Sequence, residues 1–193
     1  EPSGVCSAGY VCYQGAITAA PNDGRVTGEV CPAGYYCSAG TASPVACPAG
    51  TYNNVTGQSA CLTCPAGYFC MANSVTFLTQ PCPAGYYCPN GTLYATQYPC
   101  PAGTFSSLPL LTSESQCQAC LAGFYCASAG QTNVSGVCAP GFYCSARSTS
   151  STPVPPEGNI CPVGSYCVAG SSSARRCDGG QYCAIAGLSQ PTG

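Results

Sequence analysis

The chain has 193 residues with a formal net charge of −2, and only 5% of its residues are charged. Four arginines and no lysine cannot neutralise a phosphate backbone, so the composition excludes an ordinary nucleic-acid-binding protein. No apolar run approaches the roughly 20 residues that cross a bilayer, so we expect no membrane insertion in this segment. Twenty cysteines imply an oxidising compartment, and we therefore expect an extracellular or cell-surface protein.

A short cysteine motif recurs along the whole chain. It consists of a cysteine, two residues, a glycine, one residue, an aromatic residue in most copies, and a second cysteine. The clearest copies read CPAGYYC, at Cys31–Cys37 and Cys82–Cys88. Two longer copies open in the same way but delay the second cysteine, at Cys47–Cys61 and Cys100–Cys117. The copies use every cysteine, which predicts a tandem array of units that are too small to be stable alone.

The fixed positions of the motif have physical causes. In Cys-Pro-Ala-Gly, proline presets the first corner of a turn and glycine supplies a positive φ at the second, which predicts a type II turn. An aromatic residue five positions after the first cysteine, as at Tyr36 or Phe69, predicts one continuous apolar seam along the array. The arms between the motifs are rich in Ser, Thr, Gly and Pro and show no helical or strand periodicity.

We therefore predict a small disulfide-rich fold, an elongated tandem array of short β-ribbon and turn units with almost no helix. Cross-links replace a large hydrophobic core in such a fold. The organisation that we expect has four segments. They are short cysteine units over residues 1–46, alternating long and short units over 47–147, a Ser/Thr/Pro spacer over 148–156, and terminal short units over 157–193.

The disulfide pairing has two solutions in the sequence. Homology between the units favours bonding the first cysteine to the second inside each unit. This scheme gives Cys6–Cys12, Cys31–Cys37, Cys47–Cys61, Cys64–Cys70, Cys82–Cys88, Cys100–Cys117, Cys120–Cys126, Cys138–Cys144, Cys161–Cys167 and Cys177–Cys183. The alternative links successive units through Cys12–Cys31, Cys37–Cys47, Cys70–Cys82, Cys88–Cys100, Cys126–Cys138, Cys144–Cys161 and Cys167–Cys177. It leaves Cys6 and Cys183 for other bonds and forces the short loops Cys61–Cys64 and Cys117–Cys120.

The segment CPAGTYNNVTGQSACLTCPAGYFC, from Cys47 to Cys70, resembles the ephrin-receptor-type cysteine-rich repeat. That repeat is common in large surface and secreted proteins of protists and algae as well as in animal receptors. The short units are also similar to a turn-plus-disulfide element of tumour necrosis factor receptor modules, in which the close cysteine pair bonds to itself. The array differs from the animal receptors in having mostly short units and almost no charge.

Two Cys-x-x-Cys pairs, Cys61/Cys64 and Cys117/Cys120, have the spacing of zinc ligands or of a redox pair. Each pair also marks the end of a long unit beside the start of the next unit. We favour this second interpretation, and we expect no metal and no cofactor.

Catalytic machinery is not apparent either. The chain has no histidine or lysine, and its acidic residues are scattered among different units. We therefore expect a protein that is not an enzyme and has no catalytic residue. The acidic residues are Glu1, Asp23, Glu29, Glu114, Glu157 and Asp178.

Three N-glycosylation sequons lie in the arms, at Asn54, Asn90 and Asn133. The Ser/Thr/Pro-rich arms, above all Ser148–Thr152, are also candidates for O-linked glycans. Glycans would keep a chain with so few charges in solution.

These features together predict a structural extracellular glycoprotein, a disulfide-bonded repeat rod that assembles into a cell-surface filament, a flagellar hair or a matrix. Its partners would then be other copies of itself or related surface proteins. The alternative is the ligand-binding stalk of a receptor-type ectodomain.

Overall fold

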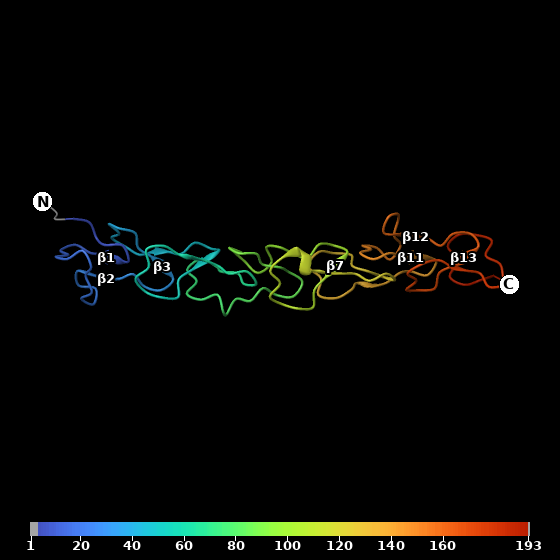
Figure 1. Cartoon of the computed structure of the whole chain (residues 1–193), viewed down its shortest axis with the longest axis horizontal. Coiled ribbons are helices and arrows are strands. Elements are labelled where there is room, and N and C mark those ends of the chain that lie inside the picture. Colours follow the sequence, from blue (N-terminus) through green and yellow to red (C-terminus); the bar gives the residue numbers. More distant parts are fainter. Residues whose placement is uncertain (1–3, 193) are drawn as a thin grey trace. The chain divides into compact units, whose positions relative to one another are not determined.

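The computed structural model describes residues 4–192 (Figure 1). The chain divides into two compact parts. The first part runs to Cys82 and includes Cys88–Gln97. The second part comprises Pro83–Tyr87 and the chain from Tyr98 onward. Glu1 lies outside the described residues. We number the cysteine units as repeats 1 to 10 in chain order.

Short antiparallel ribbons form the regular structure of both parts. The first part contains β1 (Tyr10–Cys12) with β2 (Gly28–Val30), β3 (Tyr35–Tyr36) with β4 (Val45–Ala46), and β5 (Thr51–Tyr52) with β6 (Leu62–Thr63). The second part contains β7 (Thr104–Phe105) with β8 (Gln118–Ala119), β9 (Phe124–Tyr125) with β10 (Gly136–Val137), β11 (Phe142–Cys144) with β12 (Gly158–Ile160), and β13 (Ser165–Tyr166) with β14 (Arg175–Arg176).

One pairing register generates all of these ribbons. The residue that follows the motif turn pairs with the residue just before the next repeat, as Tyr35 pairs with Ala46 and Phe142 with Ile160. Repeats 4 and 5 keep this register as single bridges, Tyr68–Pro81 and Tyr86–Pro99. Each arm therefore leaves its repeat and returns to it before the next cysteine.

Helix is almost absent from residues 4–192, where it is limited to one 3₁₀ turn over Glu114–Gln116. The prediction of a small disulfide-rich array of β-ribbon and turn units is confirmed.

All twenty cysteines lie within the described residues, and each is bonded inside its own repeat. The structure has the pairs of the intra-unit scheme, which are Cys6–Cys12, Cys31–Cys37, Cys47–Cys61, Cys64–Cys70, Cys82–Cys88, Cys100–Cys117, Cys120–Cys126, Cys138–Cys144, Cys161–Cys167 and Cys177–Cys183.

The motif turn is present, but its corners differ from the prediction. In repeat 2 the N–H of Tyr35 donates to the C=O of Pro32, so Ala33 and Gly34 occupy the corners. Proline is the first residue of the turn and not its first corner. Gly34 has a φ of +82°, the left-handed conformation that a type II turn requires at its third residue. The glycine therefore has the conformational role that its recurrence suggests.

The core also differs from the prediction. The spacing of the aromatic residues predicts a continuous apolar seam of rings, and this is wrong. The fully buried hydrophobic residues are almost all cysteines, whereas the rings are mostly half-buried beside them. The rings meet in local groups, such as Phe77 edge-on to both Tyr52 and Tyr68 at centroid distances of 5.1 and 4.9 Å. A chain with few large aliphatic residues thus fills its interior with disulfides.

Consecutive repeats are joined by main-chain hydrogen bonds at the motif glycine. The glycine N–H donates to the C=O of the second-cysteine position of the next repeat, as Gly9 does to Cys37 at 2.8 Å. Its C=O accepts from the N–H of the next repeat's first cysteine, as Gly9 does from Cys31 at 2.9 Å. Both bonds recur at all nine junctions between the described repeats, in the same register.

Each repeat has a second left-handed residue. It lies three or four positions after the second-cysteine position, and we call it the arm-turn residue. These residues are Gly15, Gly40, Gly57, Asn73, Gly91, Leu110, Gly130, Arg147, Gly170 and Gly187. In repeats 2–5 and 7–10 its N–H donates to the C=O of the preceding repeat's first cysteine, as Gly40 does to Cys6 at 2.8 Å. In the same repeats the C=O of the residue after it accepts from the N–H of the preceding second-cysteine position, as Thr41 does from Cys12 at 3.2 Å.

The motif glycine also touches the repeat two places further on. A Cβ atom at Gly123 would lie under 3.0 Å from the carbonyl oxygen of Gly170, the arm-turn residue of repeat 9. The same overlap recurs between Gly9 and Gly57, between Gly85 and Gly130, and between Gly141 and Gly187. Three successive repeats therefore meet at one glycine, where the close approach leaves no space for a side chain.

Gly123 and Gly180 allow the two roles of the motif glycine to be separated. Their φ angles are +89° and +88°, but no atom lies within 4 Å of a Cβ placed at Gly180. We expect Gly180→Ala to lose about 1–3 kcal/mol of stability, from backbone strain alone. We expect Gly123→Ala to lose a further 1–3 kcal/mol or so, from the added overlap. Urea unfolding followed by tyrosine fluorescence measures both losses, and equal losses would refute the packing role.

Candidate functional site

The arms carry the chemistry that the sequence singles out. Asn54, Asn90 and Asn133 are all exposed, in three different arms. The side-chain oxygen of Asn90 accepts from the N–H of Ala66 at 2.8 Å, and that of Asn133 accepts from Val134 at 2.8 Å. These bonds use the amide oxygen and not the Nδ2 atom, to which a glycan attaches.

The Ser/Thr/Pro arm is tied to its repeat over most of its length. Ser148 is buried, and its hydroxyl donates to the C=O of Ser150 at 3.1 Å. Thr149 donates both its N–H, at 2.8 Å, and its hydroxyl, at 2.7 Å, to the Glu157 carboxylate. Thr152 is exposed. Thr149, Ser150 and Ser151 are half-buried, so Thr152 is the most exposed residue of the segment Ser148–Thr152.

The two bonds from Thr149 hold the pKa of Glu157 below its ordinary value of 4.5, with the side-chain hydrogen bond as the larger cause. The charged carboxylate thus fixes the base of the 148–157 arm to the strand β12 that follows it. A neutral carboxyl group would accept these bonds more weakly.

An acidic residue organises the arm of repeat 1 in the same way. Asp23 accepts from the N–H groups of Val26, Thr27 and Gly28, and from the Thr27 hydroxyl at 2.6 Å. The Thr27 hydroxyl is the larger cause of the lowered pKa of Asp23. Most of the hydrogen-bonding capacity of the Asp23 carboxylate is therefore used within its own arm.

Glu29 closes the same arm from the opposite side. It accepts from the Tyr13 hydroxyl at 2.6 Å and pairs with Arg25 at 2.7 Å. The bond from Tyr13 is the main cause of the lowered pKa of Glu29. It likewise raises the pKa of Tyr13. The acidic residues of repeat 1 are thus bound within their own arm.

The long repeats replace the second cysteine with a buried polar residue. Asn53 and Ser106 stand six positions after their first cysteines and are both buried. The Asn53 side chain donates to the C=O of Tyr35 at 2.9 Å and of Ala60 at 3.2 Å. It thereby ties the long arm to repeat 2, while the disulfide moves to Cys61 at the end of that arm. The longer spacing between the cysteines of these repeats does not by itself indicate that a polar residue stands at the second-cysteine position.

The same arrangement separates the cysteines of each Cys-x-x-Cys pair. Cys61 bonds to Cys47 and Cys64 bonds to Cys70, and Cys117 and Cys120 likewise lie in different disulfides. Their sulfurs are therefore not available as thiolates. Residues 4–192 contain no group of three or more His, Cys, Asp or Glu side chains placed to hold a metal ion.

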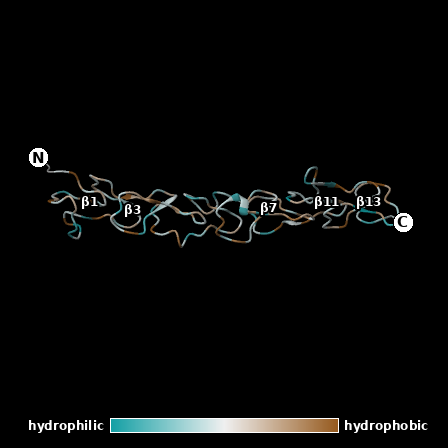
Figure 2. Ribbon diagram, in the orientation of Figure 1, coloured by the Kyte–Doolittle hydropathy of each residue, from teal (hydrophilic) through white to brown (hydrophobic). Residues whose placement is uncertain are grey.

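Exposed hydrophobic residues are scattered through the arms. Ile17, Leu108 and Val154 are among the most exposed, with Ile17 exposed to 95%. Figure 2 shows hydrophobic and hydrophilic residues alternating over short stretches of the ribbon. Within the described residues no helix is long and apolar enough to cross a membrane.

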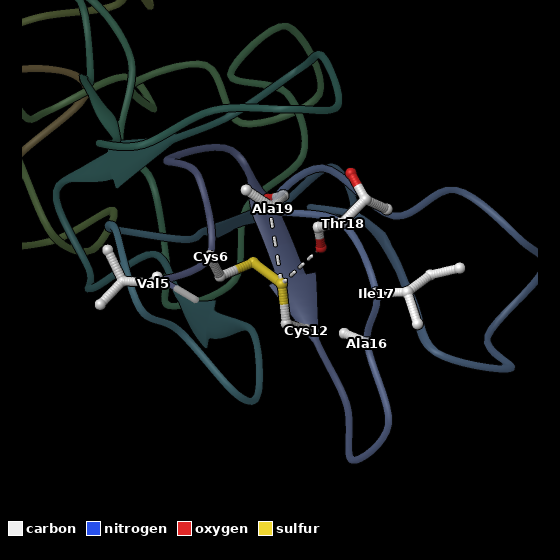
Figure 3. Close-up of a pocket in the computed structure, with 8 residues that line it drawn as sticks. Val5, Cys6, Cys12, Ala16, Ile17, Thr18 and Ala19 are labelled. Carbon is white, nitrogen blue, oxygen red and sulfur yellow. Dashed lines mark hydrogen bonds between the residues drawn. A yellow bond between two sulfur atoms is a disulfide. The ribbon is translucent and has the colours of Figure 1, made fainter. Parts of the chain in front are cut away.

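A pocket of about 170 Å³ lies over the first disulfide (Figure 3). It is lined by Cys6, Cys12 and the arm from Ala16 to Ala19, and it contains no ionisable side chain. The sulfur of Cys12 lies 3.9 Å from the carbonyl oxygens of Thr18 and Ala19. The lining therefore offers backbone carbonyl oxygens and apolar side chains but no charged group.

The residues that the motif analysis misses are the arm-turn residues. Eight of these ten positions in the described chain are glycine or asparagine, the residue types that most readily adopt a positive φ. A glycine at this offset, as in Cys-Ser-Ala-Gly40 and Cys-Val-Ala-Gly170, is the signal that marks them. Leu110 and Arg147 occupy the arm-turn position in their repeats, so the pattern of glycine and asparagine is incomplete in the sequence.

Comparison of the chain with protein-family models and with curated proteins finds no match. The arguments about function therefore rest on the chain's own repeats, arms and surfaces. Its many disulfides indicate an oxidising environment.

Glu157 gives the 148–157 arm a dependence on pH. Its pKa is lowered in the folded chain, so the arm is fully stabilised above the ordinary carboxylate pKa. We expect this stabilisation to be lost as the pH falls through the lowered value. Amide hydrogen exchange at Thr149 should accelerate there relative to the amide of Gly123, which bonds to Cys144 without an acid. Glu157→Gln should abolish the pH dependence, and a Thr149 amide whose relative exchange ignored pH would contradict the role.

Proposed function

We propose that the chain is a structural extracellular glycoprotein whose disulfide-bonded repeats build a cell-surface filament, a flagellar hair or a matrix. The observation that carries the proposal is the junction between repeats. The same main-chain bonds at Gly9, Gly50 and Gly123 join each repeat to the next, whatever the length or sequence of the arm. An arm can therefore vary or carry a glycan without altering the junction, as in a protein that is built by repetition.

The polar chemistry of the chain supports a structural role and not a catalytic one. Asp23, Glu29 and Glu157 hold their own arms through short hydrogen bonds. Asp178 pairs with Arg175 on the surface of the last repeat at 3.5 Å. Carboxylates that are already committed to hydrogen bonds within an arm are not free to exchange protons with a substrate.

The exposed side chains favour assembly with other copies or with related surface proteins. Half-buried tyrosines and single apolar residues such as Leu108, Leu121 and Val163 offer contact area with little charge to desolvate. Glycans on the arms would restrict these contacts to the surfaces between them and would keep the unassembled chain in solution.

The sequons give a direct test of the compartment and of the arms. We expect the secreted chain to carry glycans at Asn54, Asn90 or Asn133. Enzymatic release of N-glycans converts each occupied asparagine to aspartate, which peptide mass spectrometry reads at each site. The matched control is Asn53, a buried neighbour of Asn54 outside any sequon, which should stay unmodified. Complete absence of glycan at all three sites in protein from the native source would contradict the glycoprotein assignment.

The location of the chain tests the function itself. Gold-labelled antibodies against the arms should decorate fibres or matrix on the surface of the source cells, and cryo-electron microscopy of those fibres should show the cysteine repeat at regular intervals. Recovery of the chain as isolated monomers, each bound to a smaller protein ligand, would refute the structural assignment in favour of a receptor stalk.

A further inference from the structure

The three sequons differ in how the folded chain holds the residues that follow the asparagine. A sequon is defined by a Ser or Thr two positions after the asparagine, so the enzyme that adds the glycan must contact that hydroxyl as well as the amide nitrogen. Asn54, Asn90 and Asn133 are all exposed. The hydroxyl residue therefore decides which sequons the folded chain can present to the enzyme.

The sequon at Asn90 lies inside a junction between repeats. Its middle residue, Gly91, is the arm-turn residue of repeat 5, and its N–H donates to the C=O of Cys64 in repeat 4 at 2.8 Å. The C=O of Gly91 lies against Gly50 of repeat 3, where an added Cβ atom would overlap it. The main chain of this sequon is therefore held by the two repeats before it.

Thr92, the hydroxyl residue of the same sequon, is buried. Its side chain is 1% exposed, and its hydroxyl donates to the C=O of Pro89 at 2.6 Å. Its C=O accepts from the N–H of Cys70 at 3.0 Å, and the Oδ1 atom of Asn90 accepts from the N–H of Ala66 at 2.8 Å. An enzyme cannot reach the Thr92 hydroxyl unless this segment first detaches from the stack.

The hydroxyl residues of the other two sequons lie on the surface. Asn54 and its hydroxyl residue Thr56 are both exposed, as is Val55 between them. Ser135, the hydroxyl residue of the sequon at Asn133, is also exposed. Its hydroxyl accepts from the N–H of Ala127 at 2.9 Å, a bond within the same arm. Neither sequon has to leave a junction between repeats to meet an enzyme.

The groups that hold the sequon at Asn90 all precede it in the chain. They belong to Cys64, Ala66, Cys70 and Pro89. Because synthesis proceeds from the N-terminus, these partners are already present when Asn90 is made. The loop of repeat 5 closes at Cys88, two positions before Asn90. Docking of the sequon and transfer of a glycan to it therefore compete for the same segment.

We propose that Asn90 accepts its glycan only before its sequon docks onto repeats 3 and 4, whereas Asn54 and Asn133 remain acceptors in the folded chain. The donor is a lipid-linked oligosaccharide pyrophosphate. In the transfer, the bond from Nδ2 to the first sugar forms and the bond from that sugar to phosphate breaks. The lipid pyrophosphate leaves, and one amide proton goes to the solvent.

A glycan that is already attached to Asn90 is compatible with the folded chain. Asn90 is exposed, and its bond to Ala66 uses Oδ1 and not Nδ2. Docking therefore prevents the reaction at Asn90 by burying the Thr92 hydroxyl, but it does not exclude the product. The occupancy of Asn90 records whether transfer preceded docking, whereas the occupancy of Asn54 carries no such record.

Glycan transfer to the purified chain provides the test. The chain is prepared without glycans, with its native disulfides verified by mapping, and a second sample is kept reduced. Each sample is incubated with a purified oligosaccharyltransferase and its lipid-linked donor, and mass spectrometry of intact glycopeptides measures the rate at each asparagine. Asn54 is the internal control for Asn90, because both sequons end in threonine.

We expect the reduced chain to accept glycans at all three asparagines and the folded chain to accept them at Asn54 and Asn133. At Asn90 we expect folding to slow the transfer by about tenfold or more, because only the small population with a detached sequon can react. Equal rates at Asn90 in the folded and reduced chains would overturn the proposal. A folded chain that slows all three sites alike, or a reduced chain that fails to react at Asn90, would overturn it as well.

A pair of double variants tests whether repeat 5 controls the site. Cys82→Ser/Cys88→Ser opens the loop of repeat 5, and we expect Asn90 to react in the oxidised variant as it does in the reduced chain. The matched control is Cys161→Ser/Cys167→Ser, which removes a loop of the same length in repeat 9. We expect it to leave Asn90 closed. An Asn90 that stays closed when the repeat-5 loop is open would contradict the role of docking.

This inference rests on the proposed glycoprotein function, but the two fail in different experiments. Absence of glycans from the protein of the native source would refute the glycoprotein assignment, whatever the purified chain accepts. Transfer to Asn90 in the folded chain would refute only the order of modification and docking.

Discussion

The structure depends on the close approach of backbone to backbone at the motif glycine. At Gly123 the main chain of one repeat bonds to the next repeat and touches the arm-turn carbonyl of the one after. Main-chain groups are the same at every position, so the junction does not depend on the surrounding side chains. A chain with so few large apolar residues can therefore stack repeats in one register. The disulfides fill the interior that the stack encloses, where a larger domain would use leucine and isoleucine.

The junctions have the same main-chain bonds at every repeat, whereas the arms are held in different ways. The arm of repeat 1 is folded around Asp23, the arm after Cys144 around Glu157, and the long arms are tied down by Asn53 or end in the 3₁₀ turn at Glu114–Gln116. Each solution is local and satisfies the backbone of its own loop. The arms can therefore differ along the chain without disturbing the stack.

The sequence predicts those parts of the fold that depend on a recurring residue type. The Cys-x-x-Gly spacing and the even use of cysteine indicate the small disulfide-rich class, because a turn glycine and a cross-link are local requirements. The sequence does not predict the junction between repeats, because the groups that bond or touch at the motif glycine are backbone atoms one and two repeats away. The arm-turn position is hidden where Leu110 and Arg147 occupy it. The predicted seam of rings is wrong because the disulfides already fill the centre, so that rings such as Tyr36 remain at its edge.

The placement of the disulfides also determines how the chain would respond to tension. In a short repeat the bond joins cysteines six positions apart, so a pulling force bypasses that loop through the sulfurs. The long arms are enclosed by Cys47–Cys61 and Cys100–Cys117, so only the arms of the short repeats can be drawn out. Each of these can be drawn out only after the junction bonds on its repeat have broken. When the force is released, the cysteine loops are still closed and the same turns lie ready to bond again. Such a chain would lengthen in steps, dissipate energy at each step and have a fixed maximum length.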